Sequence, residues 1–190
     1  MKLIGRLTDE DVGEKVVEMN NPEIRIGARG IVLRDDGKMA VFYKTNKNEY
    51  KLPGGGLEGY ETPEDAFKRE VLEETGCQVK ITKKLGVIEE CKSINNFKQI
   101  SHVFVSKVVR DTNKLNLTEK EKYEGSKLVW ATPQEALKLI AESYDKLVES
   151  KYQSVYSTRF VILRDKKILE TYFKDLKKDP KKLETDSWDR

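Results

Sequence analysis

The sequence predicts an α/β fold of the α+β type, because strand-like segments are interrupted by two helices with clear start signals. Residues 24–33 alternate and are rich in β-branched side chains. Residues 39–44 follow a strong hairpin turn at Asp35-Asp36-Gly37-Lys38. Thr62-Pro63 and Thr132-Pro133 each place a good N-cap before a proline, which suits the first helical position.

The composition is that of a solvated domain with an ordinary core. The chain has 190 residues, of which 36% are charged and 37% hydrophobic, and its net charge is +3. The basic residues are scattered, so we expect no nucleic-acid surface. Cys77 and Cys91 do not make a disulfide framework, and we expect both to be reduced. No signal peptide or membrane span is apparent, which predicts a cytoplasmic protein without a membrane partner.

Short strands and a long irregular strand complete the expected sheet. Residues 1–7 predict a short strand, and residues 78–91 predict a long one with a bulge at Gly86. Residues 100–109 are apolar or small on both faces, as in a central strand. His102 lies in that strand, where a lone histidine is more often structural than catalytic, so we give it no role. Residues 128–131 predict another short strand.

Three carboxylates cluster on the helix that Thr62 begins and Gly76 ends. Glu70, Glu73 and Glu74 lie at i, i+3 and i+4, so they share one side of that helix. Like charges at this spacing destabilise a helix by roughly a few tenths of a kcal/mol per pair. One interpretation is an exposed acidic face. The other is a divalent cation, and oxygen ligands favour Mg²⁺, with Mn²⁺ as the alternative, over zinc.

The whole stretch is more specific than the carboxylates alone, because it resembles the signature of the Nudix hydrolase family (MutT-like proteins). The spacing is a glycine, five residues, a glutamate, seven residues, Arg-Glu, an apolar residue, two glutamates and a glycine. The matching residues are Gly55, Glu61, Arg69, Glu70, Val71, Glu73, Glu74 and Gly76. Cys77 stands where the family usually has an aliphatic residue, a place that a small buried thiol can fill. The resemblance implies an αβα sandwich around a mixed β-sheet.

The resemblance also implies roles for individual residues. Glu70, Glu73 and Glu74 would be metal ligands, joined by a backbone carbonyl near Gly54 or Gly55. The residues expected to take part in catalysis are Glu70 as the base, Arg69 and Glu73. Gly54, Gly55 and Gly56 would form the loop that approaches the phosphates, and Glu61 would orient the ligands together with Arg69. We expect Glu73→Gln or Glu74→Gln to abolish most turnover and leave the fold intact.

Residues outside the signature offer further candidates. Many family members add a carboxylate from a later loop, and among Glu119, Glu121 and Glu124 we choose Glu121 as a further metal ligand. Aromatic side chains that could stack on a base are Phe42, Tyr43, Tyr50 and Phe97, each of which packing would explain equally well.

The signature does not select the substrate. The leading hypothesis is a nucleoside triphosphate or its oxidised form, such as 8-oxo-dGTP, giving the monophosphate and pyrophosphate. Alternatives are a nucleotide sugar, ADP-ribose or a dinucleoside polyphosphate. A hypothesis of another class is a nucleotide-binding regulator without turnover, which the intact set of glutamates argues against.

The expected organisation is a Nudix domain at residues 1–150, a helical extension at 151–178 and a flexible tail at 179–190. Within the domain, a second helix should run from Thr132 to about Glu149. In the extension, apolar residues at helical spacing, including Ile168 and Tyr172, predict a pair of helices packed on the domain. The alternatives are a homodimer contact or a lid beside the substrate.

Overall fold

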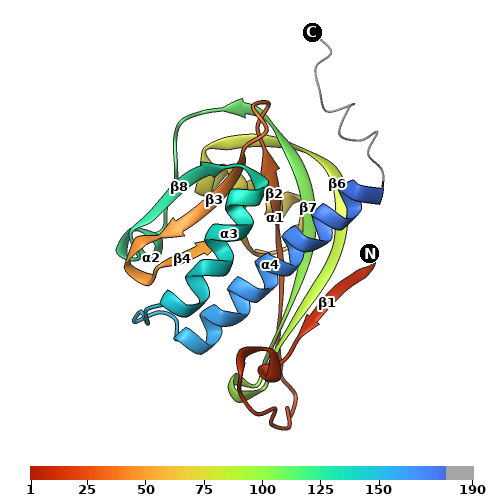
Figure 1. The fold of residues 1–190 in the computed structure, drawn as a ribbon, viewed down its shortest axis with the longest axis vertical. Coiled ribbons are helices and arrows are strands. Elements are labelled where there is room, and N and C mark those ends of the chain that lie inside the picture. The colour runs from red at the N-terminus through yellow and green to blue at the C-terminus, as the bar shows by residue number, and fades with distance from the viewer. Residues whose placement is uncertain (179–190) are drawn as a thin grey trace.

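A computed structural model describes residues 1–178 of the chain, and the prediction of a flexible tail at 179–190 lies outside them (Figure 1). Eight strands form one mixed sheet. They are β1 (Leu3–Leu7), β2 (Glu23–Leu33), β3 (Met39–Lys44), β4 (Glu49–Lys51), β5 (Gly54–Gly56), β6 (Cys77–Lys92), β7 (Phe97–Asp111) and β8 (Ser126–Ala131). The helices are α1 (Pro63–Thr75), α2 (Glu119–Tyr123), α3 (Pro133–Ser143) and α4 (Val155–Lys178).

The strand order is β1-β6-β7-β2-β3-β4, with β5 paired to β2 and β8 paired to β3. β7 lies between β6 and β2, which confirms the central strand predicted at residues 100–109. β2 pairs with β7 in parallel along its whole length, and β1 pairs with β6 in parallel. The other pairings are antiparallel. The register of β6 shifts at Gly86, whose φ is +157°, so the predicted bulge is confirmed.

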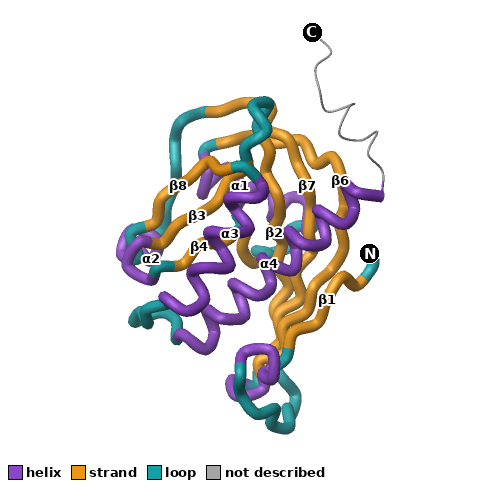
Figure 2. The backbone as a smooth tube through the Cα atoms, viewed as in Figure 1, coloured by secondary structure: helices purple, strands orange, loops and turns teal. Residues whose placement is uncertain are grey.

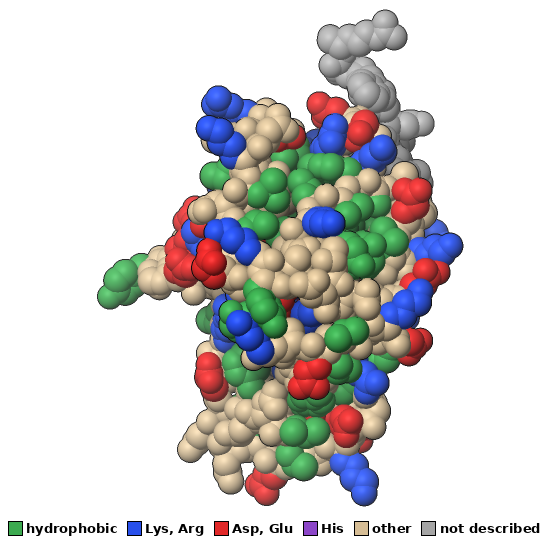
Figure 3. Space-filling model, turned by 90° about the vertical axis from the view of Figure 1, so that its left-hand side faces the viewer, with side chains coloured by type: hydrophobic (Ala, Val, Ile, Leu, Met, Phe, Trp, Pro, Cys, Tyr) green, Lys and Arg blue, Asp and Glu red, His purple; other side chains and the backbone are tan. Residues whose placement is uncertain are grey.

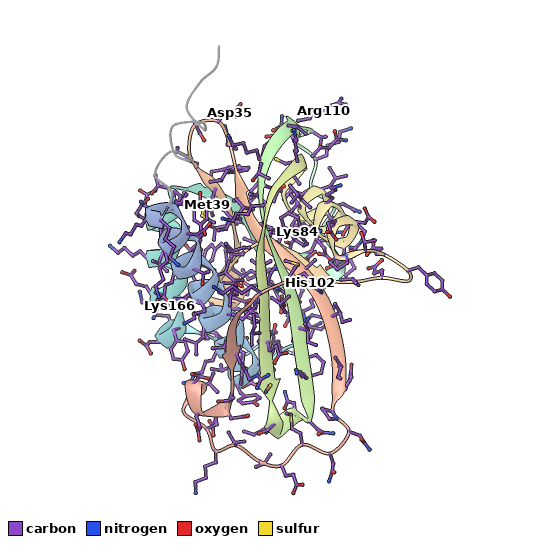
Figure 4. The ribbon with its side chains drawn as sticks, turned by 90° about the vertical axis from the view of Figure 1, so that its right-hand side faces the viewer. Asp35, Met39, Lys84, His102, Arg110 and Lys166 are labelled. Atoms are coloured by element: carbon purple, nitrogen blue, oxygen red, sulfur yellow. The ribbon has the colours of Figure 1, made fainter. Side chains whose placement is uncertain are left out.

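Helices cover both faces of the sheet. Figures 1 and 2 show α3 and α4 in front of the strands and α1 behind them. Figure 4 views the layers from the side, with Lys166 of α4 on one side of the sheet and Lys84 toward α1 on the other. Phe67 and Val71 of α1 are fully buried, while Ile140 and Ile168 enter a separate core under α3 and α4. The predicted α/β layering is confirmed.

Two predicted helical segments and one predicted loop differ from the structure. The second helix ends at Ser143 and a 3-10 turn (Tyr144–Lys146) follows, because beyond it the backbone N–H of Val148 bonds to the carbonyl of Lys47. The extension is one continuous helix, α4, in place of a pair. The long polar loop before β8 contains a short helix, α2, which begins at a capping box that the sequence displays at Thr118 and Glu121.

The strand β5 consists of three glycines and lies close against β2. Gly54 has a φ of +135°, and a Cβ there would come within 2.3 Å of the carbonyl oxygen of Ala28. Only glycine fits this approach. None of the helices in residues 1–178 is long and apolar enough to cross a membrane.

Candidate active site

Helix α1 carries most of the predicted site and is fixed at both ends. The Thr62 hydroxyl accepts the backbone N–H of Asp65 at 3.2 Å, which satisfies one of the free donors of the first turn. Gly76 is in the left-handed region, with a φ of +72°, and its N–H bonds to the carbonyl of Leu72 at 2.9 Å. These two caps determine where the acidic residues of the last turns lie.

Arg69 is the centre of a hydrogen-bond network beside β5. Its Nε and Nη2 donate to the two carboxylate oxygens of Glu61 at 2.7 and 3.0 Å, a bidentate pair. Nη2 also donates to the carbonyl of Gly56 at 3.0 Å. Hydrogen bonds from Arg69 lower the pKa of Glu61, and the same bonds raise the pKa of Arg69. The structure therefore brings Glu61 and Arg69 together and ties α1 to the glycine strand, and the orienting role of the pair stays a prediction.

Glu70 and Glu73 share the remaining nitrogen of Arg69. Nη1 lies 3.0 Å from an oxygen of Glu70 and 3.3 Å from an oxygen of Glu73. Glu70 also lies directly against Gly55, because a Cβ there would be 2.2 and 2.6 Å from its two carboxylate oxygens. A side chain at Gly55 would displace this carboxylate. The proposed base is thus held at the backbone of the glycine strand.

Glu74 is separate from the other two carboxylates. It is only 2% exposed; one of its oxygens accepts Nζ of Lys51 at 2.6 Å and the other accepts the backbone N–H of Gly54 at 2.8 Å. Burial raises the pKa of Glu74, and the ion pair with Lys51 opposes this shift. Burial alone lowers the pKa of Lys51, but Glu74 outweighs it and the pKa of Lys51 is raised. The raised pKa of Lys51 keeps its ammonium group charged beside the Glu74 carboxylate.

Lys51 is not among the site residues predicted from the sequence. Its position three residues before Gly54 was a signal, because a buried carboxylate needs a cationic partner. Nζ of Lys51 also lies 3.4 Å from the carbonyl oxygen of Gly54. Lys51 thus connects α1 to the Gly54 end of the glycine strand, whereas Arg69 contacts its Gly56 end.

The donor set fits a hard divalent cation. Glu70 and Glu73 already gather around one positively charged nitrogen, and carboxylate and carbonyl oxygens are the ligands that such ions prefer. Among residues 1–178, no three Asp, Glu, His or Cys side chains are grouped closely enough to form a complete site. The reason is visible in the contacts, since Glu74 is bound to Lys51 and the other two glutamates are bound to Arg69.

The later glutamates have local partners. Glu121 accepts the backbone N–H and hydroxyl of Thr118, each at 2.9 Å, so it caps α2, and its role as a metal ligand stays a prediction. Glu119 pairs with Lys122 on the surface. Glu124 is fully buried and accepts Nζ of Lys44 at 2.6 Å.

The aromatic candidates lie in two places. Tyr43 and Tyr50 stack on each other, with ring centroids 4.1 Å apart and planes 8° apart. Phe97 instead lines a cavity that also contains the three glycines of β5. Phe42, the fourth candidate, is fully buried, so the structure does not bring the four predicted stacking residues together. Their role toward a substrate stays a prediction.

This cavity has a volume of about 430 Å³ and lies between the sheet and the first half of α4. Its charged lining is mostly basic, with Arg25, Arg29, Lys44, Lys51, Lys92 and Arg164 against Glu49 and Glu90. The outer surface differs, because Figure 3 shows acidic and basic side chains interspersed over the face toward β8 and α2. The concentration of cations is thus a property of the cavity, and it suits an anionic ligand.

The chain is similar to known proteins in sequence and in fold. A model of the NUDIX domain matches residues 24–151 of the chain. A "MutT-like protein" of Streptomyces ambofaciens is 31% identical over 128 residues, which cover 67% of this chain and 77% of that protein. A mouse "Diphosphoinositol polyphosphate phosphohydrolase 3-alpha" is 33% identical over 107 residues, or 56% of this chain and 62% of that protein.

A Bacillus subtilis protein named "Putative 8-oxo-dGTP diphosphatase" is 32% identical over 82 residues, or 43% of this chain and 52% of that protein. Among solved structures, a NUDIX hydrolase from Nitrosomonas europaea has a TM-score of 0.57 at 18% identity, covering 80% of this chain and 90% of that one. At that identity the likeness concerns the fold alone. The match of the domain model covers well over half of the chain.

Proposed function

The chain belongs to the Nudix hydrolase family, and from this premise we propose that it hydrolyses a nucleoside triphosphate, or its oxidised form, with Mg²⁺ as cofactor. The family acts on substrates in which a nucleoside diphosphate is linked to another group. The observation that carries the proposal is the position of Glu70, pressed against Gly55 and held beside Glu73 by Arg69.

Glu70, Glu73 and Glu74, with the carbonyl of Gly54, would hold the divalent cation. When bound, such an ion supplies charge screening and Lewis acidity toward the phosphate oxygens. The protein contributes positioning: Arg69 fixes the Glu70 and Glu73 carboxylates, and Lys51 together with the N–H of Gly54 fixes Glu74. A role for Glu121 as a further ligand rests on the family resemblance alone.

In the proposed reaction, water attacks a phosphorus atom of the anhydride. The new bond joins the water oxygen to phosphorus, the bridging P–O bond breaks, and Glu70 accepts the proton that the water loses. Arg69 remains bound to Glu61 throughout, which keeps its guanidinium beside the base. The glycine strand exposes backbone without Cβ atoms, so the phosphates can approach closely.

The choice of a nucleoside triphosphate is supported by the name of the Bacillus subtilis relative and by the MutT-like relative. A second candidate is a substrate with more phosphate or a second large group, such as a dinucleoside polyphosphate, a nucleotide sugar or ADP-ribose. The basic lining of the cavity favours phosphate-rich substrates, and the mouse relative's name refers to such a compound. A regulator without turnover is disfavoured because all the signature glutamates are present.

The test is a panel of substrates incubated with the purified full-length protein and Mg²⁺, with products separated by chromatography. The panel holds nucleoside triphosphates, 8-oxo-dGTP, ADP-ribose, nucleotide sugars, dinucleoside polyphosphates and a diphosphoinositol polyphosphate. Release of pyrophosphate and a nucleoside monophosphate supports the proposal. A sugar phosphate, or two mononucleotides from a dinucleoside polyphosphate, moves the assignment to the second candidate. Metal binding without any turnover would contradict a hydrolase and favour the regulator.

A further inference from the structure

Helix α4 lies outside the stretch that matches the NUDIX domain, yet it forms one wall of the cavity beside the glycine strand. Ser157, Val161 and Arg164 of this helix line the cavity. The helix is also anchored next to the site, because the carboxylate of Asp165 accepts the backbone N–H of Leu52 at 2.8 Å, two residues before Gly54. A segment outside the matched domain therefore contributes directly to the ligand space.

Two buried donors in this cavity lack a hydrogen-bond partner among the described residues. They are Nη2 of Arg164 and Nε2 of Gln99, in side chains that are only 3% and 7% exposed. Arg164 uses its other nitrogens on Asp165 and Glu90, at 2.7 and 3.0 Å, so its guanidinium is held rigidly with one edge free. Buried donors are rarely left unsatisfied, and two in one cavity indicate a ligand with acceptor oxygens.

A third group adds a charge that has no direct ion pair. Arg29 is 6% exposed, and the one hydrogen bond of its side chain to residues 1–178 runs from Nε to the hydroxyl of Ser101 at 3.1 Å. No carboxylate in that range lies within ion-pair distance of its guanidinium. Burial and the nearby Arg164 lower the pKa of Arg29 to about 10, although the carboxylates of Asp165, Glu90 and Glu74 oppose this shift from a distance. Arg29 therefore remains charged at neutral pH. An unpaired buried cation is costly unless an anion joins it.

The cavity communicates with the catalytic strand. A Cβ on Gly27 would lie 2.7 Å from the carbonyl oxygen of Gly55 and 2.9 Å from Nε2 of Gln99. The free amide of Gln99 is therefore beside the same glycine that Glu70 contacts. A ligand that reaches from the glycine strand into the cavity would therefore pass close to Gln99 and to Arg29, which pairs with Gly54.

We propose that this cavity binds a phosphate group of the substrate, with Arg29, Arg164 and Gln99 as its donors, and that α4 thereby determines substrate specificity. The phosphate bound here is not the one that water attacks. This inference therefore rests on the proposed hydrolysis. A neutral base would accept hydrogen bonds but would leave Arg29 without a direct ion pair. A phosphate satisfies both requirements, because it offers several acceptor oxygens and negative charge.

The test separates phosphate binding from turnover. Isothermal titration with inorganic pyrophosphate, in the presence of EDTA, measures the cavity without the cation. Gln99→Met is the informative variant, because Nε2 of Gln99 makes no hydrogen bond within the described residues and its loss should not affect the fold. Gln134→Met, on the exposed face of α3, is the matched control. Melting temperatures confirm that both variants are folded.

We expect wild-type protein and Gln134→Met to bind pyrophosphate equally and Gln99→Met to bind about tenfold more weakly. With the substrate found in the panel, Gln99→Met should raise KM about tenfold and leave kcat nearly unchanged. Arg29→Met should weaken binding by more than tenfold, and its melting temperature checks that the variant is folded.

Equal pyrophosphate affinity in wild type and Gln99→Met, or no binding by the wild type at millimolar concentration, would overturn the assignment. A wild-type KM in Gln99→Met would do the same. If the substrate panel is silent but pyrophosphate binds and Gln99→Met weakens it, the anion site stands and the proposed hydrolysis fails. The two proposals can therefore fail separately.

Discussion

Replacing Glu74 by glutamine should destabilise the protein, in contrast to what the sequence alone leads one to expect. From their helical spacing, Glu73 and Glu74 are predicted to be equivalent metal ligands. The loss of either one is then expected to leave the fold intact. In the structure, Glu74 is buried and neutralises the ammonium group of Lys51, while 35% of the Glu73 side chain is exposed. Glu74→Gln therefore leaves a buried charge without its partner.

The magnitude follows from these contacts. Breaking a buried ion pair by removing one partner costs about 3–5 kcal/mol. The lower end applies here, because Nζ of Lys51 keeps its 3.4 Å contact with the Gly54 carbonyl and the glutamine oxygen can still accept a hydrogen bond. The cost of deprotonating Lys51 sets an upper limit on this loss of stability. For a lysine with the ordinary pKa of 10.5, deprotonation at pH 7 costs about 5 kcal/mol. We expect a loss of about 3 kcal/mol, or roughly 6–12 °C in Tm.

Urea denaturation followed by circular dichroism measures this loss. Glu73→Gln is the matched control and should unfold within about 0.5 kcal/mol of the wild type, since it alters a partly exposed group. The double variant Lys51→Met/Glu74→Gln should recover most of the stability, because it removes the orphaned charge. If Glu74→Gln unfolds at the wild-type urea concentration, the buried pair is not the stabilising contact that the reasoning requires.

Two further outcomes follow from the same contacts. Gly55→Ala would place a Cβ 2.2 Å from an oxygen of Glu70, so we expect a loss of about 10²-fold in turnover. Unchanged activity in a steady-state assay would refute the position given to Glu70 as the base. Burial raises the pKa of Glu90, but Arg164 and Lys92 outweigh it and lower this pKa to about 2. Because the folded-state pKa is depressed, the stabilisation is present above pH 4.5 and is lost as the pH falls toward 2, by about 3 kcal/mol. Urea midpoints between pH 6 and 2.5 check this, and Glu90→Gln should show a flatter profile; identical profiles would contradict it.

The local part of the fold was predictable because its signals lie within a few residues. The caps of α1 at Thr62 and Gly76 and the bulge at Gly86 depend on neighbouring residues or on the backbone freedom of glycine, and all three were predicted. The end of α3 was not predictable, because a backbone bond from Val148 to Lys47, distant in the sequence, draws the chain away from the helix. Tertiary contacts override helical periodicity at such places.

The candidate site divides in the same way. The spacing of Arg69 and Glu73 predicts their contact directly, since residues four apart on a helix are neighbours. The partner of Glu74 could not be inferred from the helix, because Lys51 reaches it from a different strand. The same holds for Arg164, which is 74 positions from Glu90 in the sequence and contacts it only in the folded chain. Pairings of this kind require the strand order.

The most direct test of the catalytic account is the Mg²⁺-dependent hydrolysis rate of Glu73→Gln with the substrate that the panel identifies, at equal concentrations of folded protein. Glu73 is partly exposed and its replacement should not disturb the core, so the comparison isolates the site. Because loss of even an outer residue around a metal costs about 10–100-fold, we predict a fall in kcat of about 10² or more. A kcat within a factor of two of the wild type would show that the carboxylates of α1 do not form the catalytic site.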